Sequence, residues 1–148
     1  MNQSSLISRA RLGVILSFLT HGFISSSFFA RIPDYKARLE LSNSVLGLCL
    51  LASSAGVLVA LGPVGRLAAQ RGSSAVLTKS SYLLVFIAPF VGISFNAISF
   101  AAILFLFGVA IAAQDVAMNT HGVTLEQKSG ARFMGRFHAF WSVGALLG

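Results

Sequence analysis

Three long stretches without a charged side chain constrain the fold of this chain more than any other feature. They cover residues 12–30, 41–65 and 80–114. A helix that crosses a bilayer needs about 20 mostly apolar residues, so the first two stretches each supply one crossing. The third has about 35 residues and would form a helix of about 50 Å, against a hydrocarbon core of about 30 Å. It therefore predicts two crossings with a reversal between Gly92 and Asn96, where turn-forming residues gather.

The predicted fold class is an all-α membrane protein with four complete transmembrane helices and the start of a fifth. The expected spans are about 12–30, 44–65, 76–92, 97–124 and 136–148, with Ser42 as the N-cap of the second. The last span has about twelve residues, too few to cross. We therefore expect residues 1–148 to be an N-terminal transmembrane half, truncated inside its fifth helix. Only 10% of the residues are charged, against about 25% in soluble domains, which favours a lipid-facing exterior.

The charged residues lie in short clusters between the apolar runs and predict the orientation of the chain. With a cytoplasmic N-terminus, eight basic residues fall inside and three outside, in the direction of the positive-inside rule. The formal net charge is +7, but this clustering differs from a nucleic-acid footprint, so nucleic acid is not an expected partner. The inner set is Arg9, Arg11, Arg66, Arg71, Lys79, Lys128, Arg132 and Arg136, and the outer set is Arg31, Lys36 and Arg38.

His21 is the first candidate site residue. It shares one helix face with Ser17 and Ser25, which lie four residues before and after it. A histidine in the middle of a membrane should face protein or a water-filled cavity. Two interpretations remain open: His21 binds solute or carries a proton, or it makes one hydrogen bond to a neighbouring helix.

Asp115 is the second candidate, because it lies within the fourth predicted helix. Asn119 follows one turn later on the same face. A carboxylate at this depth is costly unless it is hydrated, paired or protonated, and acids inside membranes often form proton relays. We favour a cavity-facing role in solute or proton binding, and the alternative is a fixed ion pair with a basic residue such as Arg132.

His138 and Trp141 open the fifth predicted helix. The Trp141 ring could anchor the helix at the membrane interface, or stack on a sugar or aromatic solute. We include both residues among the candidate binding residues.

The sequence contains no enzyme signature. There is no G-x-S-x-G motif, no phosphate-binding loop and no metal-ligand cluster. The one cysteine, Cys49, lies in an apolar run and is expected to fill space. Ala52, Gly56 and Ala60 are four residues apart, as in closely packed membrane helices. We expect no catalytic activity, no cofactor and no metal.

The segment 65–73 resembles the loop motif G-x-L-a-D-R-x-G-R of the major facilitator superfamily. Gly65 and Gly72 match its two glycines, and Leu67 and Ala68 match as well, whereas Ala69 and Gln70 replace the Asp and Arg of the motif. The resemblance implies a gating loop that includes Gly65, Arg71 and Gly72, with Arg71 supplying basic character.

The segment 114–148 is similar to the branch of this superfamily that includes fucose-permease-like transporters and uncharacterised bacterial inner-membrane permeases. In that branch an acid of the fourth helix lies four residues before an Asn, as Asp115 and Asn119 do. No acid lies in residues 12–30, where some members carry one, and His21 would replace it. The resemblance implies a parent of twelve helices that works by alternating access around a midplane site.

Two functions from different classes follow. The leading hypothesis is a secondary active transporter of a small polar, sugar-like solute in the inner (plasma) membrane, with a proton as coupling partner. Its other partners would be the lipid bilayer and the remaining helices of the same protein. The alternative is a non-transporting scaffold, or a channel-like oligomer of small helical subunits.

Overall fold

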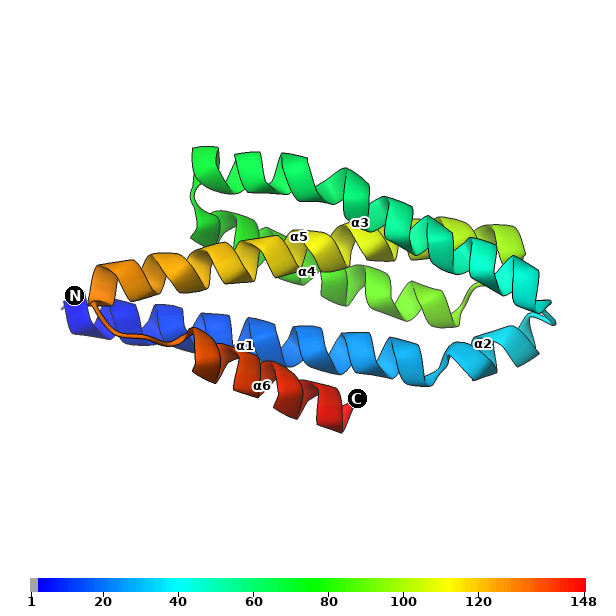
Figure 1. Cartoon of the computed structure of the whole chain (residues 1–148), viewed down its shortest axis with the longest axis horizontal. Helices are drawn as coiled ribbons and strands as arrows, with labels where there is room; N and C mark the ends of the chain where they lie inside the picture. Colours follow the sequence, from blue (N-terminus) through cyan, green and yellow to red (C-terminus); the bar gives the residue numbers. More distant parts are fainter. Residues whose placement is uncertain (1–2) are drawn as a thin grey trace.

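Six helices run back and forth along one axis in the computed structural model, which describes residues 3–148 (Figure 1). Residues 9–11, Gly72 and Gly130 lie at one end of the bundle, called here the N-terminal end. The short helix and residues 93–96 lie at the other, called the hairpin end. The helices are α1 (Gln3–Ala30), α2 (Ile32–Arg38), α3 (Asn43–Arg71), α4 (Ser73–Gly92), α5 (Ala97–Ser129) and α6 (Met134–Leu147).

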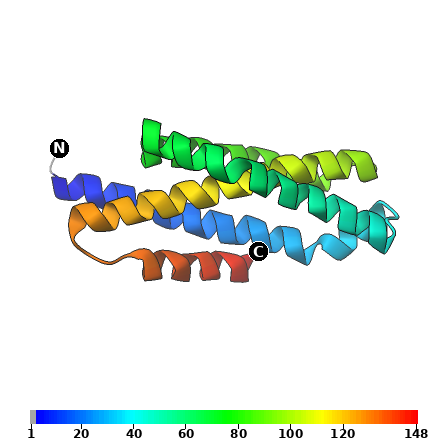
Figure 2. The ribbon, with the colours of Figure 1, turned by 45° about the horizontal axis from the view of Figure 1, so that its top comes forward.

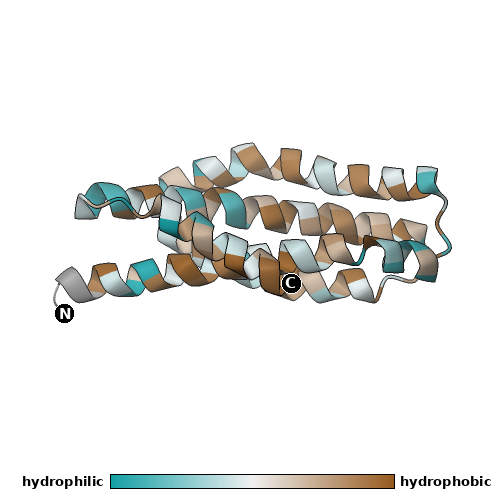
Figure 3. Cartoon of the chain, turned by 60° about the horizontal axis from the view of Figure 1, so that its bottom comes forward, coloured by the Kyte–Doolittle hydropathy of each residue, from teal (hydrophilic) through white to brown (hydrophobic). Residues whose placement is uncertain are grey.

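Four of these helices are long and apolar enough to cross a membrane, which confirms the predicted fold class. They cover Leu6–Ala30, Asn43–Arg71, Ser73–Gly92 and Ala97–Ser129. With 14 residues, α6 is about 21 Å long at 1.5 Å per residue. It lies beside α1 and ends part of the way along it (Figure 2). Hydrophilic residues gather toward the two ends of the bundle, and hydrophobic residues dominate between them (Figure 3).

Side-chain caps explain where two of the helices begin. Ser42 Oγ accepts a hydrogen bond from the Val45 amide at 3.2 Å, which confirms the predicted N-cap of α3. Asn96 and Ser99 form a reciprocal capping box at the start of α5. The long uncharged run is thereby divided between α4 and α5 by residues 93–96, and the predicted reversal is confirmed.

Two segments expected to be loops are helical instead. Gly65 and Arg71 lie inside α3, and Gly72, with φ +85°, is the single residue between α3 and α4. The polar last turns of a membrane helix can remain helical beyond the hydrocarbon core, so loss of hydrophobicity does not end the helix. The predicted loop after α1 contains the two-turn helix α2, with Pro33 in its first turn, where a missing N–H is tolerated.

Two pairs of helices, α1 with α6 and α3 with α5, cross at the same kind of contact, a glycine against a backbone carbonyl of the partner helix. A Cβ on Gly22 of α1 would overlap the carbonyl oxygen of Trp141 in α6, and one on Gly144 would overlap that of Leu19. In each case the carbonyl belongs to the residue three positions before the partner glycine. Only glycine allows backbones to approach this closely.

The pair α3 and α5 repeats this arrangement. A Cβ on Gly56 would overlap the carbonyl oxygen of Phe105, and one on Gly108 would overlap that of Ser53. The carbonyls again lie three residues before the partner glycine. The predicted close-packing role of Gly56 is thereby confirmed.

Two hydrophobic clusters fill the interior, one toward each end. The first contains Phe18, Leu77 and Ala117. The second contains Phe28, Leu84 and Ala110. In α1, α4 and α5, the residue of one cluster and the residue of the other lie on either side of a polar residue. A layer of polar side chains therefore crosses the bundle between the two clusters.

Candidate solute-binding site

The polar layer is a hydrogen-bonded chain across three helices. His21 Nδ1 of α1 lies 3.1 Å from Gln114 Oε1 of α5. Gln114 Nε2 in turn donates to Ser81 Oγ of α4 at 3.0 Å. Gln114 is fully buried and His21 is 6% exposed. Of the two interpretations of His21, the structure therefore shows the interhelical hydrogen bond directly.

Asp115 and Asn119 interact as their spacing predicts. Asn119 Nδ2 donates to Asp115 Oδ1 at 3.2 Å and to the Asp115 carbonyl at 2.9 Å. Asp115 is exposed in the described chain and close enough to His21 for their charges to interact. Arg132, the alternative partner of Asp115, interacts electrostatically with Glu126. The Asp115 carboxylate thus has the Asn119 amide as a hydrogen-bond partner, and the rest of its side chain is exposed.

A cavity of about 440 Å³ lies beside the polar layer, between α1, α3, α5 and α6. This volume lies within the range of small-molecule sites. Among the described residues, the hydroxyls of Ser25 and Ser53 have no hydrogen-bond partner, so they are available to a solute. The wall includes His21, Ser25, Phe28, Phe29, Ser53, Ser54, Ile111 and Trp141.

The structure brings together some of the predicted site residues and separates others. His21 and Trp141 line the same cavity. Asp115 and Asn119 are not among its lining residues, and Asp115 lies one turn beyond Ile111, which is a lining residue. His138 is not a lining residue; its ring packs edge-on against Phe18, with centroids 5.1 Å apart. The predicted gating residues Gly65, Arg71 and Gly72 lie toward the N-terminal end of the bundle, away from the cavity.

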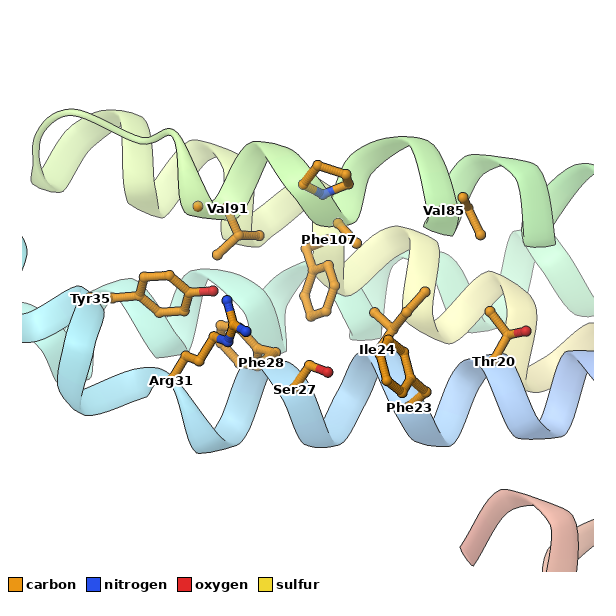
Figure 4. Close-up of a pocket in the computed structure, with 13 residues that line it drawn as sticks. Thr20, Phe23, Ile24, Ser27, Phe28, Arg31, Tyr35, Val85, Val91 and Phe107 are labelled. Carbon is orange, nitrogen blue, oxygen red and sulfur yellow. The ribbon is translucent and has the colours of Figure 1, made fainter. Parts of the chain in front are cut away.

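A second cavity, of about 470 Å³, lies between α1 and α4 toward the hairpin end (Figure 4). Its wall is mostly apolar, and Arg31 and Tyr35 supply polar groups at the end nearest α2. Partial burial raises the pKa of the Tyr35 phenol, against the opposite effect of the Arg31 and Arg38 charges. The phenol therefore stays neutral and can donate a hydrogen bond.

The start of α6 is held at the N-terminal end by Glu126. The α6 N-cap, Phe133, has no side-chain cap of its own. Glu126 Oε1 instead accepts hydrogen bonds from the backbone amides of Phe133 and of Met134, the latter at 2.8 Å. The Arg11 guanidinium lies 4.0 Å from the centroid of the Phe133 ring, a cation–π distance. These contacts connect α1, α5 and α6.

Sequence reasoning missed three polar residues of this region. Gln114 and Ser81 form the hydrogen-bonded chain with His21, and Ser53 lines the cavity. A polar residue one position before Asp115 was a usable signal for Gln114, but its partners on other helices were not visible in the sequence. No group of three or more His, Cys, Asp or Glu side chains that could hold a metal ion occurs among residues 3–148.

The fold and the lipid-compatible exterior define a multi-pass helical membrane protein. The chain is 33% identical over 133 residues to an uncharacterized MFS-type transporter of Yersinia pestis, covering 90% of this chain and 35% of that protein. It is 30% identical over 136 residues to an uncharacterized transporter of Sinorhizobium fredii, covering 92% and 36%. It is 31% identical over 141 residues to the membrane protein MosC of Rhizobium meliloti, covering 91% and 33%.

The chain belongs to the major facilitator superfamily, as the resemblance of its motifs predicts. It spans about a third of the length of the curated relatives it matches. No family model matches it, and no solved structure matches it.

Proposed function

We propose that the chain forms the N-terminal part of a secondary active transporter, which moves a small polar solute across the inner membrane by alternating access. The observation that carries this proposal is the cavity between α1, α3, α5 and α6, which adjoins a polar layer between two hydrophobic clusters. Transporters of this kind bind their solute near the bilayer midplane, and the polar layer occupies the corresponding depth of the bundle.

The solute we propose is uncharged and rich in hydroxyls, as a sugar is. Ser25, Ser53 and His21 supply hydrogen-bonding groups, and none of the residues that line the cavity is Lys or Arg. The Trp141 ring offers an apolar face on which a sugar ring can stack. A carboxylate solute would meet the negative charge of Asp115 without a compensating cation.

Asp115 is the proposed proton site. Its carboxylate accepts a hydrogen bond from the Asn119 amide, and its exposed side would be hydrated in an open state of the transporter. Closure of the cavity would remove that water, and an unpaired charge at this depth is costly. Protonation would remove the charge and permit closure, which couples proton binding to the conformational cycle.

The orientation we propose places the N-terminal end of the bundle in the cytoplasm. Eight basic residues lie toward that end and three toward the hairpin end, as the positive-inside rule requires. Gly72, in a conformation that favours glycine, forms the sharp joint there. Gly65 and Arg71 flank it in the last turns of α3 and complete the proposed gating segment.

The test is uptake into membrane vesicles that contain the protein expressed from its natural reading frame. Radiolabelled neutral monosaccharides and polyols are offered one at a time under an imposed pH gradient. With one proton per solute, a gradient of one pH unit sustains about tenfold accumulation, since a tenfold ratio corresponds to about 1.4 kcal/mol.

Asp115→Asn should abolish accumulation but keep exchange of labelled for unlabelled solute. The matched control is Asp34→Asn, which removes an exposed carboxylate of α2 at the hairpin end and should leave accumulation unchanged. Full accumulation by Asp115→Asn would contradict the proton role. Accumulation of none of the probes by the unaltered protein would contradict the solute class.

A further inference from the structure

Gln114 uses both ends of its side-chain amide inside the bundle. Its carbonyl oxygen faces His21 of α1, and its NH₂ group donates to Ser81 of α4. The side chain is fully buried, so water cannot replace either partner. A buried amide is costly to leave unpaired, so both partners are kept, and in the structure the carbonyl oxygen is the end that faces His21.

This orientation determines where His21 carries its proton. A neutral imidazole has one N–H donor and one acceptor nitrogen. Gln114 Oε1 can only accept, so the His21 nitrogen that faces it, Nδ1, must be the donor. The other nitrogen, Nε2, then keeps its lone pair.

The Nε2 atom is open to the cavity. Among the described residues, Arg11 Nε is the only fully enclosed side-chain nitrogen or oxygen without a partner. His21 Nε2 also has no protein partner among them, so it cannot be enclosed, and His21 lines the cavity between α1, α3, α5 and α6. The carboxylate of Asp115 in α5 is close enough to interact electrostatically with His21.

We propose that Gln114 is a positioning residue, which holds His21 in its Nδ1-protonated form and presents the Nε2 lone pair to the cavity as a hydrogen-bond acceptor. In combination with the proposed function, on which this step rests, the solute group that meets His21 must be a donor. A hydroxyl fits that requirement. A carbonyl or carboxylate oxygen does not, because two acceptors would face each other.

The test needs no solute. The protein expressed from its natural reading frame is labelled with ¹⁵N-histidine, reconstituted in lipid bilayers and examined by solid-state NMR at pH 8, where an ordinary histidine is neutral. The His21 signals are assigned as those that disappear in His21→Asn. We expect a protonated Nδ1 and an unprotonated Nε2.

Two variants separate positioning from general packing. Gln114→Leu should move the His21 proton to Nε2, the tautomer that free histidine prefers, whereas Gln114→Glu keeps an acceptor and should leave Nδ1 protonated. The control is Gln127→Leu, an exposed glutamine of the same helix, which should leave the His21 spectrum unchanged.

A His21 proton on Nε2 in the unaltered protein would overturn the proposal, because it would mean that the Gln114 amide has the reverse orientation. An Nδ1 proton that survives in Gln114→Leu would overturn it as well. If a variant fails to fold, the spectrum of the unaltered protein still tests the proposal. It is also independent of the Asp115 uptake experiment, so failure of one does not imply failure of the other.

Discussion

Replacement of Gly56 by alanine should loosen the crossing of α3 and α5. A Cβ at this position would overlap the backbone carbonyl oxygen of Phe105, which cannot move away as a side chain can. Overpacking of this kind costs about 1–3 kcal/mol, and the rigid obstacle favours the upper part of that range. The higher helix propensity of alanine offsets about 1 kcal/mol. We therefore expect a net loss of about 1–2 kcal/mol in the free energy of unfolding.

Gly47→Ala is the matched control, because it lies in the same helix with nothing within 4 Å of the added carbon. It should gain up to about 1 kcal/mol from propensity alone, so the two variants should differ by about 2–3 kcal/mol.

The assay is reversible unfolding in mixed detergent micelles, followed by the emission of Trp141, the single tryptophan of the chain. Equal stability of Gly56→Ala and Gly47→Ala would refute the close crossing and the packing argument built on it.

Three further outcomes follow from single contacts. Glu126→Gln should speed hydrogen exchange at the amides of Phe133 and Met134, because both lose a charged acceptor; unchanged exchange would contradict this helix cap. Trp141→Phe should raise the KM for uptake of a sugar probe by about two- to tenfold, which corresponds to the binding energy of one ring-stacking contact. An unchanged KM would exclude stacking. Cys49 is 3% exposed and should react with N-ethylmaleimide only after unfolding, so rapid labelling of the folded protein would contradict its burial.

The number of membrane helices and the position of the reversal between the third and fourth could be predicted from the sequence, because the thickness of the bilayer sets the length of a span. A run without charges can be measured against the thickness of the hydrocarbon core, and this argument divided residues 80–114 correctly. The Asp115–Asn119 contact was also predictable, since two residues one turn apart on a helix must be neighbours.

The partners of each helix could not be predicted in the same way. His21 and Gln114 are 93 positions apart, and their contact depends on how α1 and α5 are rotated about their own axes. A membrane helix has hydrophobic residues on all its faces, so the hydrophobic pattern does not determine this rotation. Arg71 illustrates a different error. Its charge marks the end of the hydrophobic run, but the hydrogen bonds of the helix continue to that residue.

The two glycine crossings also have a mechanical consequence. Where backbones touch directly, no side-chain rotamers remain to absorb a change of angle, so α1 with α6 and α3 with α5 should each move as a stiff unit. The boundary between these units is then the compliant part of the bundle. The His21–Gln114 hydrogen bond lies on that boundary, since it joins α1 to α5, and the cavity has walls from both units. A small hinge motion between two stiff pairs would therefore change the width of the cavity while both crossings stay intact.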